Sequence, residues 1–161
     1  MTQNKTRSIY NSIVSTHLII LILATLIIGI VYTIRQNGEL TSDKDFMLLE
    51  LLVPLIAVSS FIVSHFIGKN KLNTLDKQAK LQVKLSTFKQ IKVIQWVSLF
   101  GSVILASVGF LISGQQNLLL YAMMIGVMIL YFRPIKARVI EDLNLSPEES
   151  DAFTQTDNNW F

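Results

Sequence analysis

Residues 17 to 34 read "HLIILILATLIIGIVYTI" and contain no charged side chain. At a rise of 1.5 Å per residue, a helix of this length is about 27 Å long, close to the thickness of the hydrocarbon core of a bilayer. An uncharged apolar run of this length is typical of a transmembrane helix. This stretch therefore predicts that the chain crosses a membrane.

Three more apolar stretches follow, at residues 47–67, 93–112 and 118–132. The first two of these are long enough to span a bilayer, whereas the third is about 22 Å long and needs flanking residues or local thinning. Only 16% of the residues are charged, against about a quarter in soluble domains. We expect an all-α, four-helix integral membrane bundle over residues 1–145, with a polar cytoplasmic tail at 146–161.

The distribution of basic residues predicts the orientation of this bundle. With four spans, the N-terminal segment, residues 68–92 and the tail share one side, and they hold twelve of the 14 lysines and arginines. The opposite side holds Arg35 and Lys44. Basic residues in short loops favour the cytoplasmic side. The sequence therefore predicts a multi-pass inner-membrane protein with both termini in the cytoplasm.

The basic stretch 68–92 also has helical periodicity. Leu72, Leu75, Ala79 and Val83 follow one stripe, whereas Leu81, Leu85 and Phe88 follow another. This shift predicts a cytoplasmic helical hairpin that continues spans two and three and bends near residues 76–80. Its lysines either fix the topology or contact anionic lipid headgroups, at about 1 kcal/mol each. These candidate lipid contacts are Lys69, Lys71, Lys77, Lys80, Lys84, Lys89 and Lys92. No aromatic or glycine-rich pattern of nucleic-acid recognition accompanies them, so we expect no nucleic-acid partner.

Glu50 is the one acidic residue inside a predicted span, about one turn from its outer end and four residues before Pro54. A carboxylate within a bilayer is a candidate proton or cation site. The alternative is an interfacial residue that reaches water or pairs with Lys44 or Arg35, and its shallow depth favours this alternative.

The remaining polar residues in the spans indicate structural contacts. His65 and Gln95 lie at similar depth on spans two and three, where they are candidates for an interhelical hydrogen bond. His17 is expected at the membrane interface, as is Trp96 in an aromatic belt. The chain has no cysteine and no nucleotide-binding or hydrolase motif, so we expect no metal, no cofactor and no catalytic residues.

Small residues recur at a spacing of four in the predicted spans, as in Ser102 and Ala106 or Ser64 and Gly68. Such ridges let helix backbones approach closely where lipid provides no hydrophobic drive. We expect them to pack the bundle of a single chain, with contacts between copies of the chain as the alternative.

The tail reads "RPIKARVIEDLNLSPEE" from Arg133. Pro134 suits a first helical position, and Ser146 with Glu149 has the spacing of a capping box for a second short helix. With the four spans and the basic hairpin, this tail resembles that of a group of small, uncharacterised bacterial four-span inner-membrane proteins. The resemblance covers most of the chain from about Leu48 and implies a fold and a location, without an activity. In that group an acid often precedes the glycine of span three, where this chain has Phe100.

Three classes of function remain open. The first is a non-enzymatic accessory or assembly protein of the inner membrane, which acts through its helix faces and the cytoplasmic hairpin on another membrane protein or on a second copy of itself. The second is a small oligomeric transporter or channel that uses Glu50 as its proton or cation site. A membrane enzyme ranks third, because such enzymes bring several polar residues together within their spans.

Overall fold

The structure is a computed structural model that describes residues 2–38, 47–74 and 79–155, and within these it contains six helices and no strand. The prediction of an all-α fold is confirmed. The long helices are α1 (Thr2–Asn37), α2 (Met47–Asn73), α3 (Leu81–Ser113) and α4 (Gln116–Tyr131). The short helices are α5 (Lys136–Asp142) and α6 (Pro147–Thr154).

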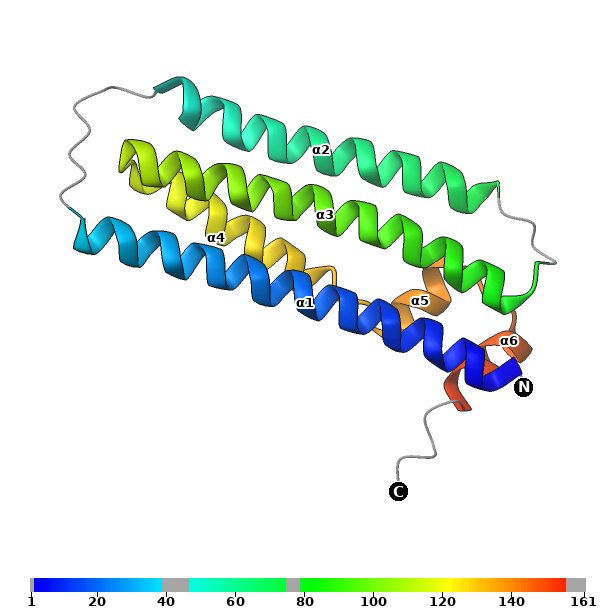
Figure 1. The fold of residues 1–161 in the computed structure, drawn as a ribbon. Helices are drawn as coiled ribbons and strands as arrows, with labels where there is room; N and C mark the ends of the chain where they lie inside the picture. Colours follow the sequence, from blue (N-terminus) through cyan, green and yellow to red (C-terminus); the bar gives the residue numbers. More distant parts are fainter. Residues whose placement is uncertain (1, 39–46, 75–78, 156–161) are drawn as a thin grey trace.

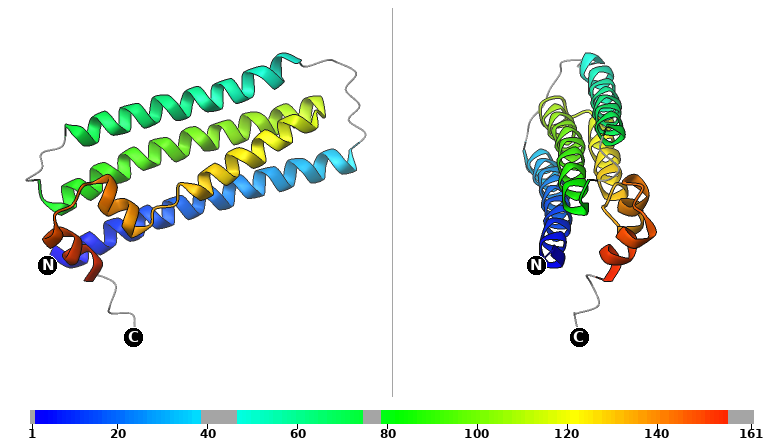
Figure 2. Two further views of the ribbon diagram at one scale, coloured as in Figure 1. Left: turned by 180° about the vertical axis from the view of Figure 1, so that it is seen from behind. Right: turned by 90° about the vertical axis from the view of Figure 1, so that its right-hand side faces the viewer.

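α3 is the central helix of the bundle. It packs against α1 on one side and α2 on the other, while α4 contacts all three (Figures 1 and 2). Half of the most apolar window of α3 is buried, against 22% of the corresponding windows of α1 and α2. The outer faces of α1 and α2 therefore consist largely of exposed apolar side chains.

Three helices, α1, α2 and α3, are long and apolar enough to cross a membrane. The fourth predicted span corresponds to α4, which has only 16 residues. α4 and α5 are long and apolar enough to cross a membrane only when they are taken together, and their axes are bent by 80° relative to each other. α1 begins 15 residues earlier than the predicted first span and has 36 residues, so its N-terminal part extends along α5 and α6 (Figure 1).

The basic stretch 68–92 is built as expected from continuations of its neighbours. α2 continues to Asn73 and α3 begins at Leu81. The predicted bend falls partly on residues 75–78, which lie outside the described residues. The N-terminus of α1, the C-terminus of α2, the N-terminus of α3 and both short helices lie at the same end of the molecule (Figure 1). We call this the basic end.

Small residues pack inwards where the helices meet. Ser102 and Ala106 of α3 and Ser64 of α2 are buried. A Cβ at Gly68 would come within 2.5 Å of Ile91 Cγ2, so a larger residue here would force Ile91 or the two helices to shift. The expectation that these ridges pack a single chain agrees with this arrangement.

The prediction that Trp96 lies in an aromatic belt at the membrane interface is wrong. Its side chain is fully buried between the helices at 0% exposure, in the cluster that also contains Phe88 and Leu99. Its position near a span end indicated the interface, but the close approach of α1, α3 and α4 encloses it.

The C-terminal helices follow the sequence signals in part. Ser146 Oγ accepts from the Glu149 backbone N–H, and the Glu149 carboxylate accepts from the Ser146 backbone N–H, which confirms the capping box. Pro134 lies two residues before α5 and not at its first position, because Ile135 is extended and serves as N-cap. α6 is not a free tail, since its Phe153 is fully buried against the bundle.

Candidate functional site

A polar internal region surrounds the break between α4 and α5. We use the term "the break" for residues 132–135. Pro134 has no N–H and disfavours helical geometry at Arg133, so the α-helical ladder stops here. At the end of α4, Met128 O and Leu130 O still accept from the backbone N–H groups of Phe132 and Arg133, whereas Ile129 O and Tyr131 O have no helical donor. Such carbonyls need other partners if they are buried or lie in lipid.

Side chains from three other helices donate to these carbonyls. The hydrogen bonds run from Tyr10 Oη to Pro134 O (3.1 Å), from His17 Nε2 to Ile129 O (2.8 Å), from Trp96 Nε1 to Phe132 O (3.3 Å) and from Arg138 Nη1 to Tyr131 O. Every donor is distant in sequence from its acceptor except Arg138. The break is therefore stabilised by the packing of α1 and α3 around it.

The prediction that His17 lies at the membrane interface is wrong. It is 5% exposed, and the edge of its ring contacts Trp96 at a centroid distance of 4.8 Å. Because a carbonyl can only accept, Nε2 must carry a proton. Helical spacing does place His17 on the same face as the buried Ile13 and Ala24. Residues 17–34 carry no charge on any side, however, so the sequence does not reveal which face is inside.

A pocket of about 250 Å³ lies beside the break, between α2, α3 and α5. We call it the break pocket. It is lined by His65, Phe88, Lys92, Gln95, Tyr131, Phe132, Arg133, Pro134, Arg138, Glu141 and Asp142. Two of the sequence-predicted site residues, His65 and Gln95, thus come together here. Within the described chain they form no hydrogen bond with each other: His65 is exposed and stacks on Phe61 at 6.0 Å.

Gln95 is a buried polar residue that lines this pocket. It is 7% exposed, and none of the hydrogen bonds among the described residues involves its side chain. Its Nε2 lies beside Gly68, where an added Cβ would be 3.2 Å away. The amide is therefore held by packing alone.

The charged residues of the break pocket are unevenly paired. Lys92 forms an ion pair with Asp142 at 2.9 Å and lies over the Phe88 ring. The Arg138 guanidinium lies over the Tyr131 ring at 4.6 Å. Arg133 is exposed and has no side-chain partner among the described residues.

The predicted lipid-contacting lysines divide into two groups. Three of them contact the protein itself: Lys84 pairs with Glu149 at 2.7 Å, Lys89 donates to Ser12 Oγ at 2.7 Å, and Lys92 pairs with Asp142. Three others are exposed, namely Lys69, Lys71 and Lys80, although Lys71 also donates to Gln90. Lys77 lies outside the described residues.

The Lys84 pair fastens α6 to the bundle. The Lys84 side chain is only 6% exposed, and its ammonium donates to both oxygens of Glu149. Burial alone would raise the pKa of Glu149, but hydrogen bonds from Lys84 and Ser146 and the charge of Lys84 outweigh it and lower that pKa. Close by, Phe153 meets the Tyr10 ring edge-on at 5.3 Å.

Glu50 lies at the other end of the bundle. It is half-buried near the start of α2 and accepts a hydrogen bond from Asn117 Nδ2 of α4 at 3.0 Å. Of the two partners weighed for it, Lys44 lies outside the described residues and Arg35 points elsewhere. The sequence does not predict Asn117 as the partner, because the first turn of α4, which carries it, has no charged residue that would indicate a contact with Glu50.

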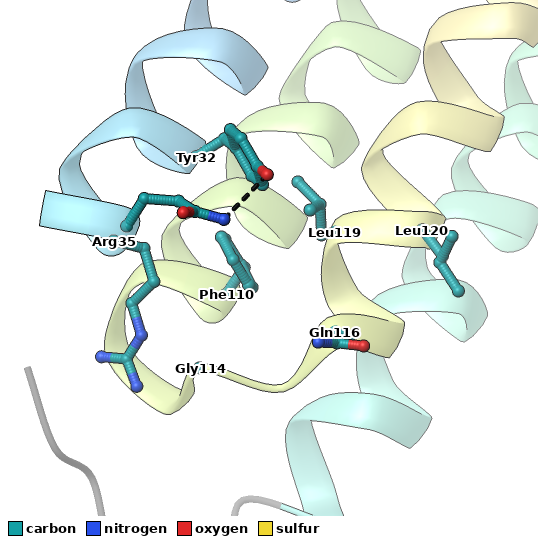
Figure 3. A pocket seen from close by; sticks show the side chains of 8 residues that line it. Tyr32, Arg35, Phe110, Gly114, Gln116, Leu119 and Leu120 are labelled. Atoms are coloured by element: carbon teal, nitrogen blue, oxygen red, sulfur yellow. Dashed lines mark hydrogen bonds between the residues drawn. The ribbon is translucent and has the colours of Figure 1, made fainter.

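Arg35 lies beside a second pocket, of about 470 Å³, between α1, α3 and α4 (Figure 3). Its guanidinium donates to Leu111 O at 3.5 Å, which places a cation at the C-terminus of α3, where the helix dipole favours it. Gly114, which ends α3 with φ 73°, borders the same guanidinium so closely that a Cβ would collide with it. Gln36, which also lines this pocket, donates to Tyr32 Oη at 2.8 Å.

Among the described residues, no three His, Asp or Glu side chains lie close enough together to hold a metal ion. No protein family, curated protein or solved structure matches the chain. The candidate site is thus defined by its own geometry: a capped helix break with a small, partly basic pocket beside it.

Proposed function

We propose that this chain is a four-span inner-membrane protein with both termini in the cytoplasm, and that it acts as a non-enzymatic accessory or assembly protein. The observation that carries the proposal is the division of its surface. The outer faces of the long helices are apolar, whereas the polar side chains around the break, α5 and α6 are largely engaged within the chain. Such a molecule presents helix faces rather than reactive groups to its surroundings.

The arrangement of the basic end supports the proposed topology. The helix ends that carry most of the basic residues gather there (Figure 1), as expected if they share the cytoplasmic side. The capped break supports a membrane location as well, because irregular backbone is tolerated at membrane depth only where its carbonyls are satisfied.

Reporter fusions test the topology. Green fluorescent protein fused after residue 155 or inserted between residues 74 and 80 should fluoresce. Alkaline phosphatase fused within residues 39–46 should be active, because that segment is expected outside the cytoplasm. Phosphatase activity from a fusion between residues 74 and 80 would overturn the orientation.

Site-specific photocrosslinking tests the accessory role. A photoreactive amino acid at Val97 or Ile104, on the exposed stripe of α3, should form a protein adduct of defined mass in native membranes. The matched control is Ala106 on the buried side of the same helix, which should react only within the chain. If outward positions on all four long helices form adducts with lipid alone, the protein acts without a stable partner and the proposal fails.

A further inference from the structure

The break pocket lies where the outer surface changes from apolar to basic. On α2, the exposed apolar residues Phe66 and Ile67 are followed within four residues by Lys69 and Lys71. His65, which lines the pocket, directly precedes this change. In a membrane, a boundary of this kind coincides with the headgroup region.

The pocket contains three permanent cations and two carboxylates. Lys92 and Asp142 neutralise each other. Glu141 forms no ion pair among the described residues, and neither do Arg133 and Arg138. The pocket therefore has one positive charge in excess, apart from His65, and it has a guanidinium that is free to bind an anion.

Gln95 is the second, independent indication of a ligand. It is more than nine-tenths buried and lines the pocket, yet it has no hydrogen-bond partner among the described residues. Its amide atoms are not among the fully enclosed polar atoms that lack a partner, so they face the accessible space of the pocket, where a ligand can reach them. A phosphate oxygen in the pocket would accept from its Nε2–H.

We propose that the break pocket binds the phosphate group of an anionic phospholipid. Arg133 supplies the charged donor, Gln95 supplies a buried neutral donor, and His65 closes the side formed by α2. Guanidinium groups pair well with phosphate oxygens, and basic pockets between transmembrane helices on the cytoplasmic side suit anionic headgroups.

A lipid fits the surroundings better than a free phosphate ion does. Tyr131 lines the pocket and is largely exposed, and Phe66 projects from α2 next to His65. Acyl chains attached to the phosphate would cover such apolar surface, which a free ion would leave exposed. This inference depends on the proposed membrane location.

The test uses the full chain, purified in mild detergent and stripped of lipid, with binding measured by native mass spectrometry. The probes are phosphatidylglycerol, phosphatidylcholine and inorganic phosphate. We expect phosphatidylglycerol to bind well above the other two. Arg133→Gln should weaken this binding by about tenfold, the loss of one charge-assisted hydrogen bond. Lys69→Gln, which removes an equal charge from the same end but outside the pocket, should weaken it less than about twofold.

Gln95→Met provides a readout that distinguishes binding from folding. It keeps the size of the side chain and removes the unpartnered amide, so lipid-free protein should be at least as thermostable as the wild type. Its binding of phosphatidylglycerol should nevertheless fall. A lipid-free variant that is less stable than wild type would show that the amide serves the fold, and the inference would be wrong.

Equal losses from Arg133→Gln and Lys69→Gln would also overturn the inference, because binding would then be diffuse attraction to a basic surface. Equal binding of phosphatidylcholine would exclude anion recognition, and equal binding of inorganic phosphate would exclude a lipid. The membrane location is tested separately by extraction of native membranes with alkaline carbonate. Release of the protein by carbonate would refute the proposed function, whereas retention together with equal losses would refute this inference alone.

Discussion

His17 shows how one polar side chain can support an interruption in a distant helix. Its hydrogen bond joins α1 to Ile129 O, 112 residues away, near the point where α4 ends. The neighbouring side chains of Trp96 and Tyr10 donate hydrogen bonds to carbonyls that follow α4, at Phe132 and Pro134. A helix that stops at membrane depth needs such donors, so we expect His17 to contribute to stability and not to chemistry.

His17→Leu should lower the free energy of unfolding by about 1–3 kcal/mol, because Ile129 O would stay buried without a donor. Thermal unfolding in detergent, followed by size-exclusion chromatography, measures the loss. The matched control is His65→Leu, which alters an exposed histidine and should change stability by no more than about 0.5 kcal/mol. Equal effects of the two variants would contradict the role assigned to His17.

Gly101 within α3 and Gly114 at its C-cap differ in their surroundings and provide a second prediction. Gly114→Ala forces a Cβ into the Arg35 guanidinium at a left-handed φ of 73°, and should destabilise the protein by about 1–2 kcal/mol. Gly101→Ala adds a Cβ to open space within the helix and should stabilise it by about 0.5–1 kcal/mol. The two melting temperatures should therefore shift in opposite directions, and a shared direction would exclude this explanation.

At the scale of the element, α6 behaves as a fastened segment and not as a tail. Its attachment depends on Glu149 with Lys84 and on Phe153 with Tyr10. The carboxylate of Glu149 also completes the capping box of its own helix. One side chain therefore connects the formation of α6 to its docking.

Docking of α6 should depend on pH through Glu149. Its pKa in the folded protein lies below the ordinary value of 4.5, so the undocked carboxyl binds protons more readily. The stabilisation of docked α6 by Glu149 is complete above about pH 4.5. It is lost as the pH falls through the lower pKa that Glu149 has in the folded protein. Hydrogen exchange of residues 147–154 between pH 7 and pH 3, corrected for intrinsic rates, should show protection that decreases at the acidic end.

Glu149→Gln should reduce that protection at pH 7 and remove its dependence on pH in this range, because the ammonium of Lys84 loses its charged partner. The expected loss of docking stability is about 2 kcal/mol, typical of a hydrogen bond to a charged group. Glu148→Gln changes the exposed neighbour by the same charge and should leave the profile intact. If Glu149→Gln leaves the pH dependence of hydrogen-exchange protection unchanged, another group must be responsible for that dependence.

Sequence patterns predict which residues of this protein form helices, but they predict the contacts between those helices only in part. Apolar runs of sufficient length indicate helices whatever surrounds them, and the spacing of Ser146 and Glu149 is a purely local signal. The burial of His17 and Trp96 depends on how α1 and α3 rotate about their axes. A helix that is apolar on every face has no amphipathic pattern to specify that rotation.

The candidate site was predicted only in part for a related reason. His65 and Gln95 were placed at similar depth by counting residues along two helices, which is enough to bring them to one pocket. Arg133 and Arg138 line the break pocket only because the chain bends by 80° after α4. Pro134 indicates that a helix stops, but the direction in which the chain then turns depends on tertiary packing.

At the scale of the whole molecule, the two candidate roles of Glu50 can be separated. Its position at the end of the bundle, with Asn117 as its partner, favours an interfacial hydrogen bond over an ion pathway. Glu50→Gln should change stability by no more than about 1 kcal/mol and should not alter proton or sodium flux in proteoliposomes. Loss of an ion flux that the wild type supports would instead establish the transporter hypothesis. Asn117→Asp is the companion variant, and it should destabilise more because it places two carboxylates together.

The attachment of α6 also has a consequence during synthesis. Glu149 and Phe153 leave the ribosome after all four long helices, yet their partners Lys84 and Tyr10 belong to earlier segments. A nascent chain that stops before residue 149 therefore presents a lysine without its carboxylate and a tyrosine without its aromatic neighbour. Completion of the basic end thus distinguishes a chain that includes α6 from one that stops before it.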